Sequence, residues 1–493
     1  MVDYPRKGEN VKKVFFLLVC LVGPAIIGFV GSRGVEYKLD ESFRKAIAIK
    51  NPGDRYSDIR LRHVCASPKA REALGSVCID IDMLVLMQRG ALLVGVLSLL
   101  MVALISLGGK IAAKNRTALL TLFVPGLYIT MGTTCLIVII NAALLFGTIW
   151  YVESILIERV HIGIMLGLAM GAIFSVLAMI GSSFRALKKA TSFSLGKALF
   201  EKDAPELWEF VKNLATKVGA QPPKNIVVGL DPNFYVTEAN VLCLDGVLTG
   251  RTLYLSLPLS RILAREELTA VVGHEFGHFI GYDTKFSSRF YPVYRGATGA
   301  LFSLGFGAKS KKRNIGVFLA SLPAIQILGY FLDTFSTIER EISRQREIEA
   351  DKVGAALGGK KNLAVALVKI HAFTPNWAGM NDLIIKQLSE GLSVGNMSAL
   401  FSQVVSEKAN KDALKGLAEA HMIHPTDTHP PLVDRLSSLS MSMGHVEDDS
   451  LVVAPPDPAI RLIRHHEKIE TDLSNVRQTN LIRSMRVQLS QKG

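Results

Sequence analysis

Apolar residues are concentrated in the first third of the chain, where they form four long segments. These segments cover residues 14–30, 86–108, 118–150 and 161–181. A helix needs about 20 apolar residues to cross the hydrocarbon core of a bilayer, so each segment predicts a membrane-spanning helix. No A-x-A-like cleavage site follows the first segment, and we interpret it as a retained span rather than a signal peptide.

The segment 118–150 is too long for one straight span and barely long enough for two. The charges around it favour one of these alternatives, because cytoplasmic loops carry an excess of Lys and Arg. A basic loop precedes the segment at 110–116, and a basic cluster follows the last apolar segment at 185–189. One crossing places both basic stretches in the cytoplasm, whereas two crossings would place the second one outside. We therefore predict four spans and place the region after them in the cytoplasm.

A polar loop of mixed charge, roughly 31–82, is expected between the first two spans. It contains Cys65 and Cys78, two of the five cysteines in the chain. These two could form a disulfide if the loop lies outside the cytoplasm, because disulfides persist in oxidising compartments. The cysteines include no C-x-x-C pair of the kind that binds metal.

After about residue 190 the pattern becomes that of a globular protein. Residues 204–218 have the apolar spacing of a helix, whereas 224–230 and 252–257 are β-rich segments bounded by Pro, Gly and Asp. Residues 265–280 begin with acidic side chains and again have helical spacing. The chain is therefore expected to be mainly α with a small β-sheet, following N-terminal transmembrane helices.

The same pattern suggests three parts. Residues 1–190 are expected to form a membrane domain, 191–440 a globular domain and 441–493 a polar, peripheral tail. The mean hydropathy of +0.31 agrees with a protein built largely for a membrane. The net charge of +13 is explained by basic flanks of the apolar segments. Because no module that combines aromatic and basic residues appears, we expect a lipid bilayer as a partner and no nucleic acid.

The helix at 265–280 carries the sequence His274-Glu275-Phe276-Gly277-His278. Histidines at positions i and i+4 of a helix present both imidazoles on one face. Zinc binds imidazole and carboxylate groups, and a glutamate beside them can take a proton from metal-activated water. The alternative is a pair of surface histidines on an ordinary helix, so further residues have to decide between the two.

A third ligand is expected on another helix, and residues 337–357 provide a candidate. Within this charged helical stretch, Glu347 and Asp351 stand four residues apart, again on one face. Glu347 is the candidate third zinc ligand, and Asp351 the residue that accepts a ring N–H from a ligand histidine. The alternative is a solvated charged face, in which neighbouring arginines and lysines pair with these carboxylates.

With both helices in view, the chain resembles the HtpX and CAAX prenyl-protease family of membrane zinc metallopeptidases. The resemblance is carried by H-E-x-x-H at 274–278, by E-x-x-x-D at 347–351, and by a late His429-Pro430 followed by Arg435. It covers roughly residues 195–440. The family implies an α+β zincin-type metallopeptidase domain that holds one Zn²⁺ per chain.

The resemblance also implies a role for each matching residue. His274, His278 and Glu347 would bind the metal, and Glu275 would be the general base; Asp351 would support a ligand histidine. His429 and Arg435 are further catalytic candidates, because this region lies close to the site in relatives and can gate it or contact the reacting carbonyl. The alternative for these last two is a simple helix start, since His-Pro-Pro is good helix-entry sequence.

A hydrophobic insertion, at about 285–335, separates the two metal helices. Since both helices would serve one zinc, the insertion must cross the membrane twice or not at all. Its tip is basic at 309–313, and a crossing from the cytoplasm would carry these charges outside, against the charge rule. We therefore expect the insertion to lie in the membrane interface.

The sequence thus predicts an integral-membrane zinc endopeptidase with a polypeptide substrate. A role in the quality control of membrane or envelope proteins, at a bacterial inner membrane, is the preferred reading. A CAAX prenyl-protein endoprotease is the alternative with the same chemistry. A non-catalytic membrane scaffold or chaperone that keeps the peptidase fold is the alternative of another class. The oligomeric state stays open.

Overall fold

The computed structural model describes the chain outside residues 1–6, 51–57, 158, 187–190, 282–289, 292, 300, 303–314, 418–429 and 491–493. The chain divides into two compact units. We call one the globular unit, which comprises Met1–Val2, Lys189–Arg289 and Arg340–Gly493. The other, Asp3–Lys188 with Phe290–Glu339, is the bundle unit.

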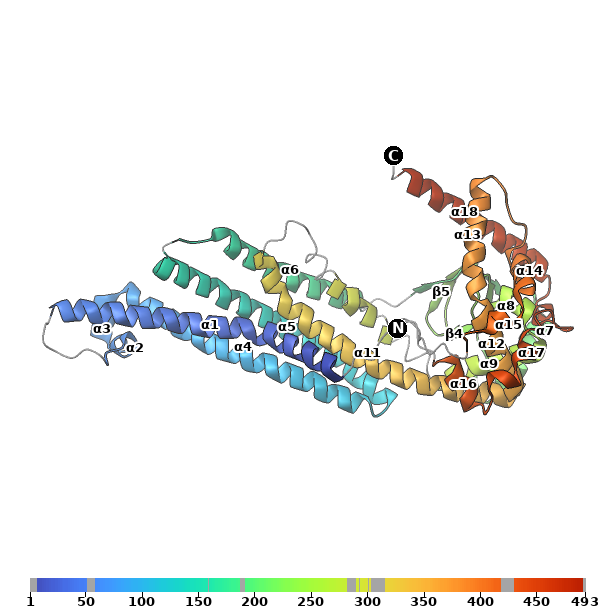
Figure 1. Cartoon of the computed structure of the whole chain (residues 1–493), viewed down its shortest axis with the longest axis horizontal. Coiled ribbons are helices and arrows are strands. Elements are labelled where there is room, and N and C mark those ends of the chain that lie inside the picture. Colours follow the sequence, from blue (N-terminus) through green and yellow to red (C-terminus); the bar gives the residue numbers. More distant parts are fainter. Residues whose placement is uncertain are drawn as a thin grey trace. The chain divides into compact units, whose positions relative to one another are not determined.

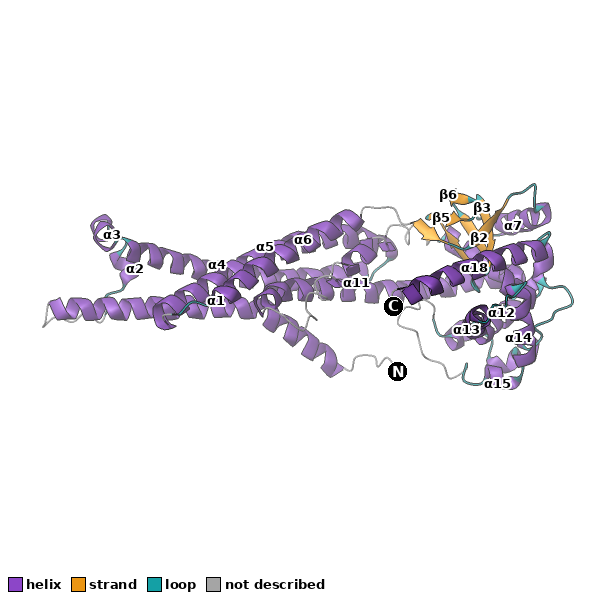
Figure 2. Ribbon diagram, turned by 90° about the horizontal axis from the view of Figure 1, so that it is seen from above, coloured by secondary structure: helices purple, strands orange, loops and turns teal. Residues whose placement is uncertain are grey.

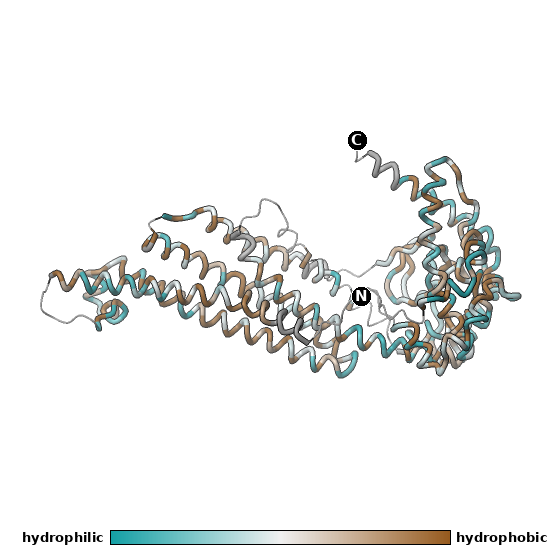
Figure 3. The backbone as a smooth tube through the Cα atoms, viewed as in Figure 1, coloured by the Kyte–Doolittle hydropathy of each residue, from teal (hydrophilic) through white to brown (hydrophobic). Residues whose placement is uncertain are grey.

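Four helices in the described part of the chain are long and apolar enough to cross a membrane. They belong to the bundle unit and are α1 (Lys7–Lys50), α4 (Ser76–Ala112), α5 (Arg116–Val152) and α6 (Ile162–Ala186) (Figure 1). Apolar residues line these helices over most of their length (Figure 3). The long segment 118–150 forms one helix, so the four expected apolar helices are confirmed.

The expected polar loop at 31–82 is wrong, because most of it is helical. α1 continues to Lys50, and α2 (Leu61–Val64) and α3 (Pro68–Leu74) precede α4. Helical spacing places Val35 on a face that packs with Leu61, Ile81 and Leu84. Apolar spacing in a stretch too polar to span a membrane therefore still makes a helix.

A disulfide joins Cys65 and Cys78, whose Cα atoms are 5.5 Å apart. The bond links the short helices to the start of α4. Beside it, the backbone N–H of Leu61 donates to Asp40 Oδ1 (2.7 Å), and Gln88 Nε2 donates to Glu36 Oε2 (2.7 Å). This end of the bundle is therefore held by covalent and polar contacts as well as by apolar packing.

The hydrophobic insertion belongs to the bundle unit as far as it is described. Its last part is the first half of α11 (Ile315–Gly358). Phe123 of α5 contacts Phe290 and Phe331 of the insertion at ring-centroid distances of 4.2 and 5.7 Å, and Tyr330 shares a hydrogen bond of 2.8 Å with Ser106 of α4. The sequence favours an interfacial position, whereas the structure packs these residues against the apolar helices.

The globular unit is built around two small sheets (Figure 2). The four-stranded sheet has the order β2-β3-β7-β4, with β3 and β7 parallel and the outer pairs antiparallel. Its strands are β2 (Gly196–Leu199), β3 (Asn225–Gly229), β7 (Thr252–Ser256) and β4 (Tyr235–Thr237).

The second sheet has three strands in the order β1-β5-β6. They are β1 (Thr191–Phe193), β5 (Asn240–Cys243) and β6 (Gly246–Leu248). One face of this sheet carries Val241 and Cys243, both buried, and Cys243 packs with Tyr254 and Val227 of the larger sheet.

The helices around the larger sheet pack into two apolar clusters, and the first of these also contains the strands of that sheet. Those before the second metal helix are α7 (Pro205–Lys217), α8 (Leu257–Ile262) and α9 (Arg265–Ile280). Those after it are α12 (Lys360–Phe373), α13 (Pro375–Ser389), α14 (Met397–Lys408), α15 (Lys411–Leu414), α16 (Leu432–Ser438), α17 (Glu447–Ser450) and α18 (His466–Ser490). The expected mainly α fold with small sheets is confirmed.

The C-terminal segment is part of this core rather than a peripheral tail. Ile460, Ile469 and Leu473 are buried in the main apolar cluster. Glu470 of α18 is also fully buried, where it accepts two hydrogen bonds from Arg261 of α8 (2.7 and 2.5 Å). The polar composition suggested a peripheral tail, but a charged side chain of this segment, Glu470, is paired with Arg261 inside the core.

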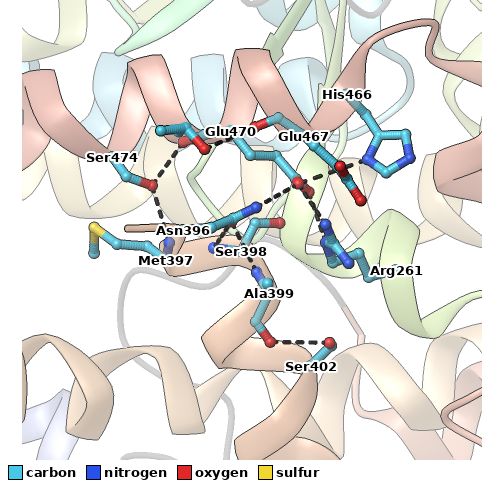
Figure 4. Close-up of polar contacts among 11 residues, drawn as sticks. Arg261, Asn396, Met397, Ser398, Ala399, Ser402, His466, Glu467, Glu470 and Ser474 are labelled. Atoms are coloured by element: carbon cyan, nitrogen blue, oxygen red, sulfur yellow. Dashed lines mark hydrogen bonds and ion pairs between the residues drawn. The ribbon is translucent and has the colours of Figure 1, made fainter. Parts of the chain in front are cut away.

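Figure 4 shows the polar contacts that join α18 to α8 and α14. Asn396 Nδ2 donates to Glu470 Oε2 (2.8 Å), and the backbone N–H of Met397 donates to Ser474 Oγ (2.9 Å). Burial opposes ionisation of Glu470, but the hydrogen bonds from Arg261 and Asn396 lower its pKa below the ordinary value. The carboxylate is therefore charged and compensated inside the core.

Replacing Arg261 with Met should destabilise the globular unit by about 3 kcal/mol, because a buried carboxylate then lacks its cation. Adding Glu470→Gln to that variant should recover part of the loss, since the neutral amide needs no counter-charge. Chemical denaturation of the purified protein measures both effects. Arg461→Met is the matched control, because its pair with Asp457 is exposed and worth at most about 1 kcal/mol; equal losses in both variants would contradict the argument.

Candidate metal centre

The first turn of α9 is fixed by a buried ion pair. Glu267 Oε2 accepts a hydrogen bond from the backbone N–H of Ala264 (2.9 Å), just before the helix. The same carboxylate lies 2.9 Å, at both oxygens, from Lys369 Nζ of α12, which also donates to the Ile262 carbonyl (3.3 Å). Burial raises the pKa of Glu267 and lowers that of Lys369. α9 is thereby anchored to the neighbouring helix about two turns before His274.

Small residues let α9 approach the second half of α11 very closely. A Cβ at Gly277 would lie 2.7 Å from the Cα of Ala350, and one at Gly273 would lie 3.0 Å from the Cα of Gly354. In the other direction, a Cβ at Gly354 would lie 2.5 Å from the Ala270 carbonyl oxygen. The two backbones therefore touch along a stripe in which side chains have no room.

This contact brings three side chains together, namely His274 and His278 of α9 and Glu347 of α11. The two histidine Nε2 atoms are 3.2 Å apart. His274 Nε2 lies 3.4 Å from Glu347 Oε2, and His278 Nε2 lies 3.4 Å from Glu347 Oε1. The last two distances involve different oxygens of Glu347, and one donor atom from each residue lies within 4.8 Å of the other two. We call these three residues the donor triangle.

The pairwise distances between these side chains are close to those expected around zinc. Ligand atoms at about 2.0–2.1 Å from Zn²⁺, at tetrahedral angles, lie about 3.3 Å from one another. The donor set of two imidazoles and one carboxylate is also a catalytic zinc set, with one tetrahedral position left for water. Both the distances and the chemistry of these residues agree with a zinc site.

Asp351 lies directly behind the first histidine. Its Oδ1 atom is 2.8 Å from His274 Nδ1, on the side of the ring opposite the donor triangle. An acceptor at this position selects the tautomer with the proton on Nδ1 and leaves Nε2 free to bind metal. Asp351 therefore stands where the sequence expects it.

Arg435 of α16 holds Asp351 from the far side. Its Nε donates to Asp351 Oδ2 (2.8 Å) and its Nη2 to Asp351 Oδ1 (2.5 Å). Nη2 is also 3.4 Å from His274 Nδ1. Arg435 is buried, and its geometry is that of a positioning residue for Asp351 and His274. The expected contact with a reacting carbonyl stays a prediction.

These contacts set the charges around the site. Burial opposes protonation of His274, but hydrogen bonds with Asp351 and Glu347 raise its pKa to about 9. Burial also opposes ionisation of Asp351, whereas hydrogen bonds from Arg435 and His274 lower its pKa. In the metal-free protein a proton competes with metal for the His274 ring, so metal binding weakens as the pH falls.

The remaining predicted residues are Glu275 and His429. Glu275 is buried on α9 beside the two histidines, and its charge is one of those that stabilise the Arg435 guanidinium. His429 lies outside the described residues. Sequence reasoning did not recognise the glycines of the helix contact, although their spacing of four residues, at 273 and 277 and at 354 and 358, was visible.

Replacing Gly277 with Ala should remove most of the bound zinc and destabilise the protein by about 1–3 kcal/mol. The added methyl group meets backbone atoms of α11, so the two helices must separate. Metal analysis and thermal unfolding of the purified protein measure the two effects. Gly379→Ala is the matched control, because its site in α13 is open; full zinc content and unchanged stability in the Gly277 variant would refute the role of the close contact.

Known proteins are similar to the part of the chain that contains these residues. A family model described as Peptidase family M48 matches residues 201–442. A protein named Protease HtpX homolog from Pyrococcus furiosus is 31% identical over 262 residues, which cover 50% of this chain and 76% of that protein. One of the same name from Polynucleobacter necessarius is 30% identical, covering 49% and 84%.

A third Protease HtpX homolog, from Bifidobacterium longum, is 25% identical over 346 residues, which cover 66% of this chain and 98% of that protein. The aligned lengths thus extend over most of each relative. The matched region 201–442 includes both metal helices and Arg435. Together with the donor triangle, these similarities show that the chain belongs to the M48 family of zinc metallopeptidases.

Proposed function

We propose that this protein is an integral-membrane zinc endopeptidase in which His274, His278 and Glu347 hold the metal. The observation that carries the proposal is the donor triangle at the contact of α9 and α11, in which each pair of side chains approaches to 3.2–3.4 Å. Zinc bound there would polarise the scissile carbonyl and make water acidic enough to react at neutral pH.

The protein's own residues transfer the protons and orient the metal-binding side chains. Glu275 takes the proton from the attacking water and delivers it to the departing amine nitrogen as the peptide bond breaks. Asp351 keeps the His274 ring in the metal-binding tautomer, and Arg435 keeps Asp351 ionised and in place. His429 is proposed only as a neighbour of the site, by resemblance to the family.

The substrate would lie as an extended chain along β4, the strand at one edge of the larger sheet. β4 pairs with β7 on one side only, so the N–H and C=O groups along its other edge could form hydrogen bonds with a substrate strand. β4 also packs against α9, which carries the histidines. Recognition by added β pairing would explain how one site accepts many sequences.

We further propose that the bundle unit anchors the protein and that the peptidase site faces the cytoplasm, at a bacterial inner membrane. The disulfide between Cys65 and Cys78 supports this orientation, because such bonds persist outside the cytoplasm. Starting from that side, α4, α5 and α6 cross in turn, so the chain after Ala186 emerges inside. The basic loop at 110–116 then lies inside as well, in agreement with the charge rule.

Quality control of membrane or envelope proteins is the physiological role that we favour. Four apolar helices before the peptidase region, and a hydrophobic insertion within it, match the HtpX-like arrangement better than an enclosed chamber for lipidated substrates. Incubation with unfolded casein and with a prenylated peptide separates these alternatives. Cleavage of the prenylated peptide alone would favour the CAAX-type reaction.

The mechanism predicts different outcomes for two glutamates. Glu275→Gln should keep zinc bound but lower casein cleavage by about 10²-fold or more, since the general base is lost. Glu347→Ala should lose both zinc and activity. Metal analysis and a chelator-sensitive cleavage assay in detergent distinguish them. Full cleavage by the Glu275 variant would refute the mechanism, and an unchanged zinc content in the Glu347 variant would remove that residue from the proposed ligands. Folded, zinc-loaded protein without cleavage of any substrate would favour the scaffold.

The orientation predicts which cysteines react in intact cells. A cysteine introduced at Lys69, an exposed residue between Cys65 and Cys78, should react with an impermeant maleimide in intact cells. A cysteine introduced at Asp448, whose side chain is 90% exposed, should react only after lysis. Gel shifts of the labelled protein give the readout, and labelling of residue 448 in intact cells would reverse the orientation.

A further inference from the structure

The three-stranded sheet exposes a row of large apolar side chains. Phe193 of β1 is paired with Leu242 of β5, and Leu242 is paired with Val247 of β6. Side chains that are directly opposite one another on neighbouring strands project from the same face. The three are 69%, 38% and 58% exposed, respectively, and Leu244 at the following turn is 48% exposed. We call these four residues the sheet patch.

The sheet patch differs from ordinary scattered exposure. Among the described residues of the globular unit, nine large apolar side chains are exposed, and four of these form the patch. The opposite face of the sheet is buried, with Val241 at 0% exposure and Cys243 in an apolar cluster. The sheet is therefore apolar on both faces, and a contiguous exposed apolar surface marks an interaction site.

The patch is held rigidly rather than on a loose hairpin. Asp245, in the turn between β5 and β6, accepts a hydrogen bond from the backbone N–H of Ala198 in β2 (2.7 Å). The backbone N–H of Leu244 donates to the Gly196 carbonyl (3.0 Å). These bonds fix the turn to the larger sheet, so the exposed side chains cannot fold back onto the protein.

The position of the patch in the chain points to its partner. The apolar helix α6 ends at Ala186, and β1 begins at Thr191. Covalent geometry limits the separation of those two Cα atoms to about 18 Å, which keeps β1 near the bilayer surface at which α6 ends. The connecting sequence carries Lys188 and Lys189, which suit anionic lipid headgroups.

We propose that the sheet patch inserts into the headgroup region of the bilayer and seats the globular unit on the membrane surface. Phe193, Leu242 and Val247 would enter the boundary between headgroups and acyl chains, as apolar faces of interfacial segments do. The peptidase region would then be held against the membrane at a second point besides its covalent connection. A surface of this kind would restrict the enzyme to chains that emerge close to the bilayer.

A tryptophan at the first position of the row tests the proposal without reference to catalysis. Phe193→Trp protein is reconstituted in phosphatidylcholine vesicles with or without brominated acyl chains, which quench tryptophan on contact. Leu383→Trp is the matched control, because Leu383 is also exposed, at 61%, but lies on α13. The chain's three native tryptophans contribute equally to both samples, and the emission of the parent protein is subtracted.

The proposal predicts blue-shifted emission from residue 193 and loss of its intensity in brominated vesicles, with neither effect at residue 383. Adding Leu242→Asp and Val247→Asp to the Phe193→Trp protein should abolish both effects while zinc content stays unchanged. Emission from residue 193 equal to that of the control, without quenching, would overturn the proposal. A response only to added unfolded casein would also overturn it, and would identify the patch as a polypeptide site.

Discussion

The metal centre depends on one packing constraint, which is the contact between α9 and α11 at backbone distance. Each helix supplies only part of the donor triangle, so the triangle exists only while the two helices touch. Gly273, Gly277 and Gly354 make that approach possible, since a methyl group at any of them would meet backbone atoms of the other helix. Interiors packed to this density do not adjust to an added carbon. These glycines do not bind metal themselves, but they set the distances between the side chains that are proposed to bind it.

Buried ion pairs also fix the positions of α9 and α11 at this contact. Glu267 and Lys369 anchor the start of α9, and the bidentate pair of Arg435 and Asp351 lies behind His274. Such pairs add little net stability compared with apolar packing, but they are expensive to break singly. Their value here is positional, because each one fixes an element that carries a proposed ligand. The pair between Arg261 and Glu470 does the same for α18, which completes the core of the globular unit.

The two units differ in where they place large apolar side chains. In the bundle unit, apolar side chains face outward over long helices, as expected of surfaces in contact with lipid. In the globular unit, exposed apolar residues are few, which is why the row of Phe193, Leu242 and Val247 stands out. The row becomes visible only when strand register is known, since its members come from three separate strands.

The sequence by itself determined the local properties of this protein. Long apolar segments determined the four bundle helices, helical spacing put His274 and His278 on one face, and E-x-x-x-D at 347–351 supplied the matching acidic residues. These predictions rest on periodicity along a single helix, which residue order fixes. Only the tertiary structure decided how Arg435 contacts Asp351, how Glu470 is buried and how closely α9 approaches α11. Those features join segments tens to hundreds of residues apart, and their energies depend on burial and distance, which composition does not contain.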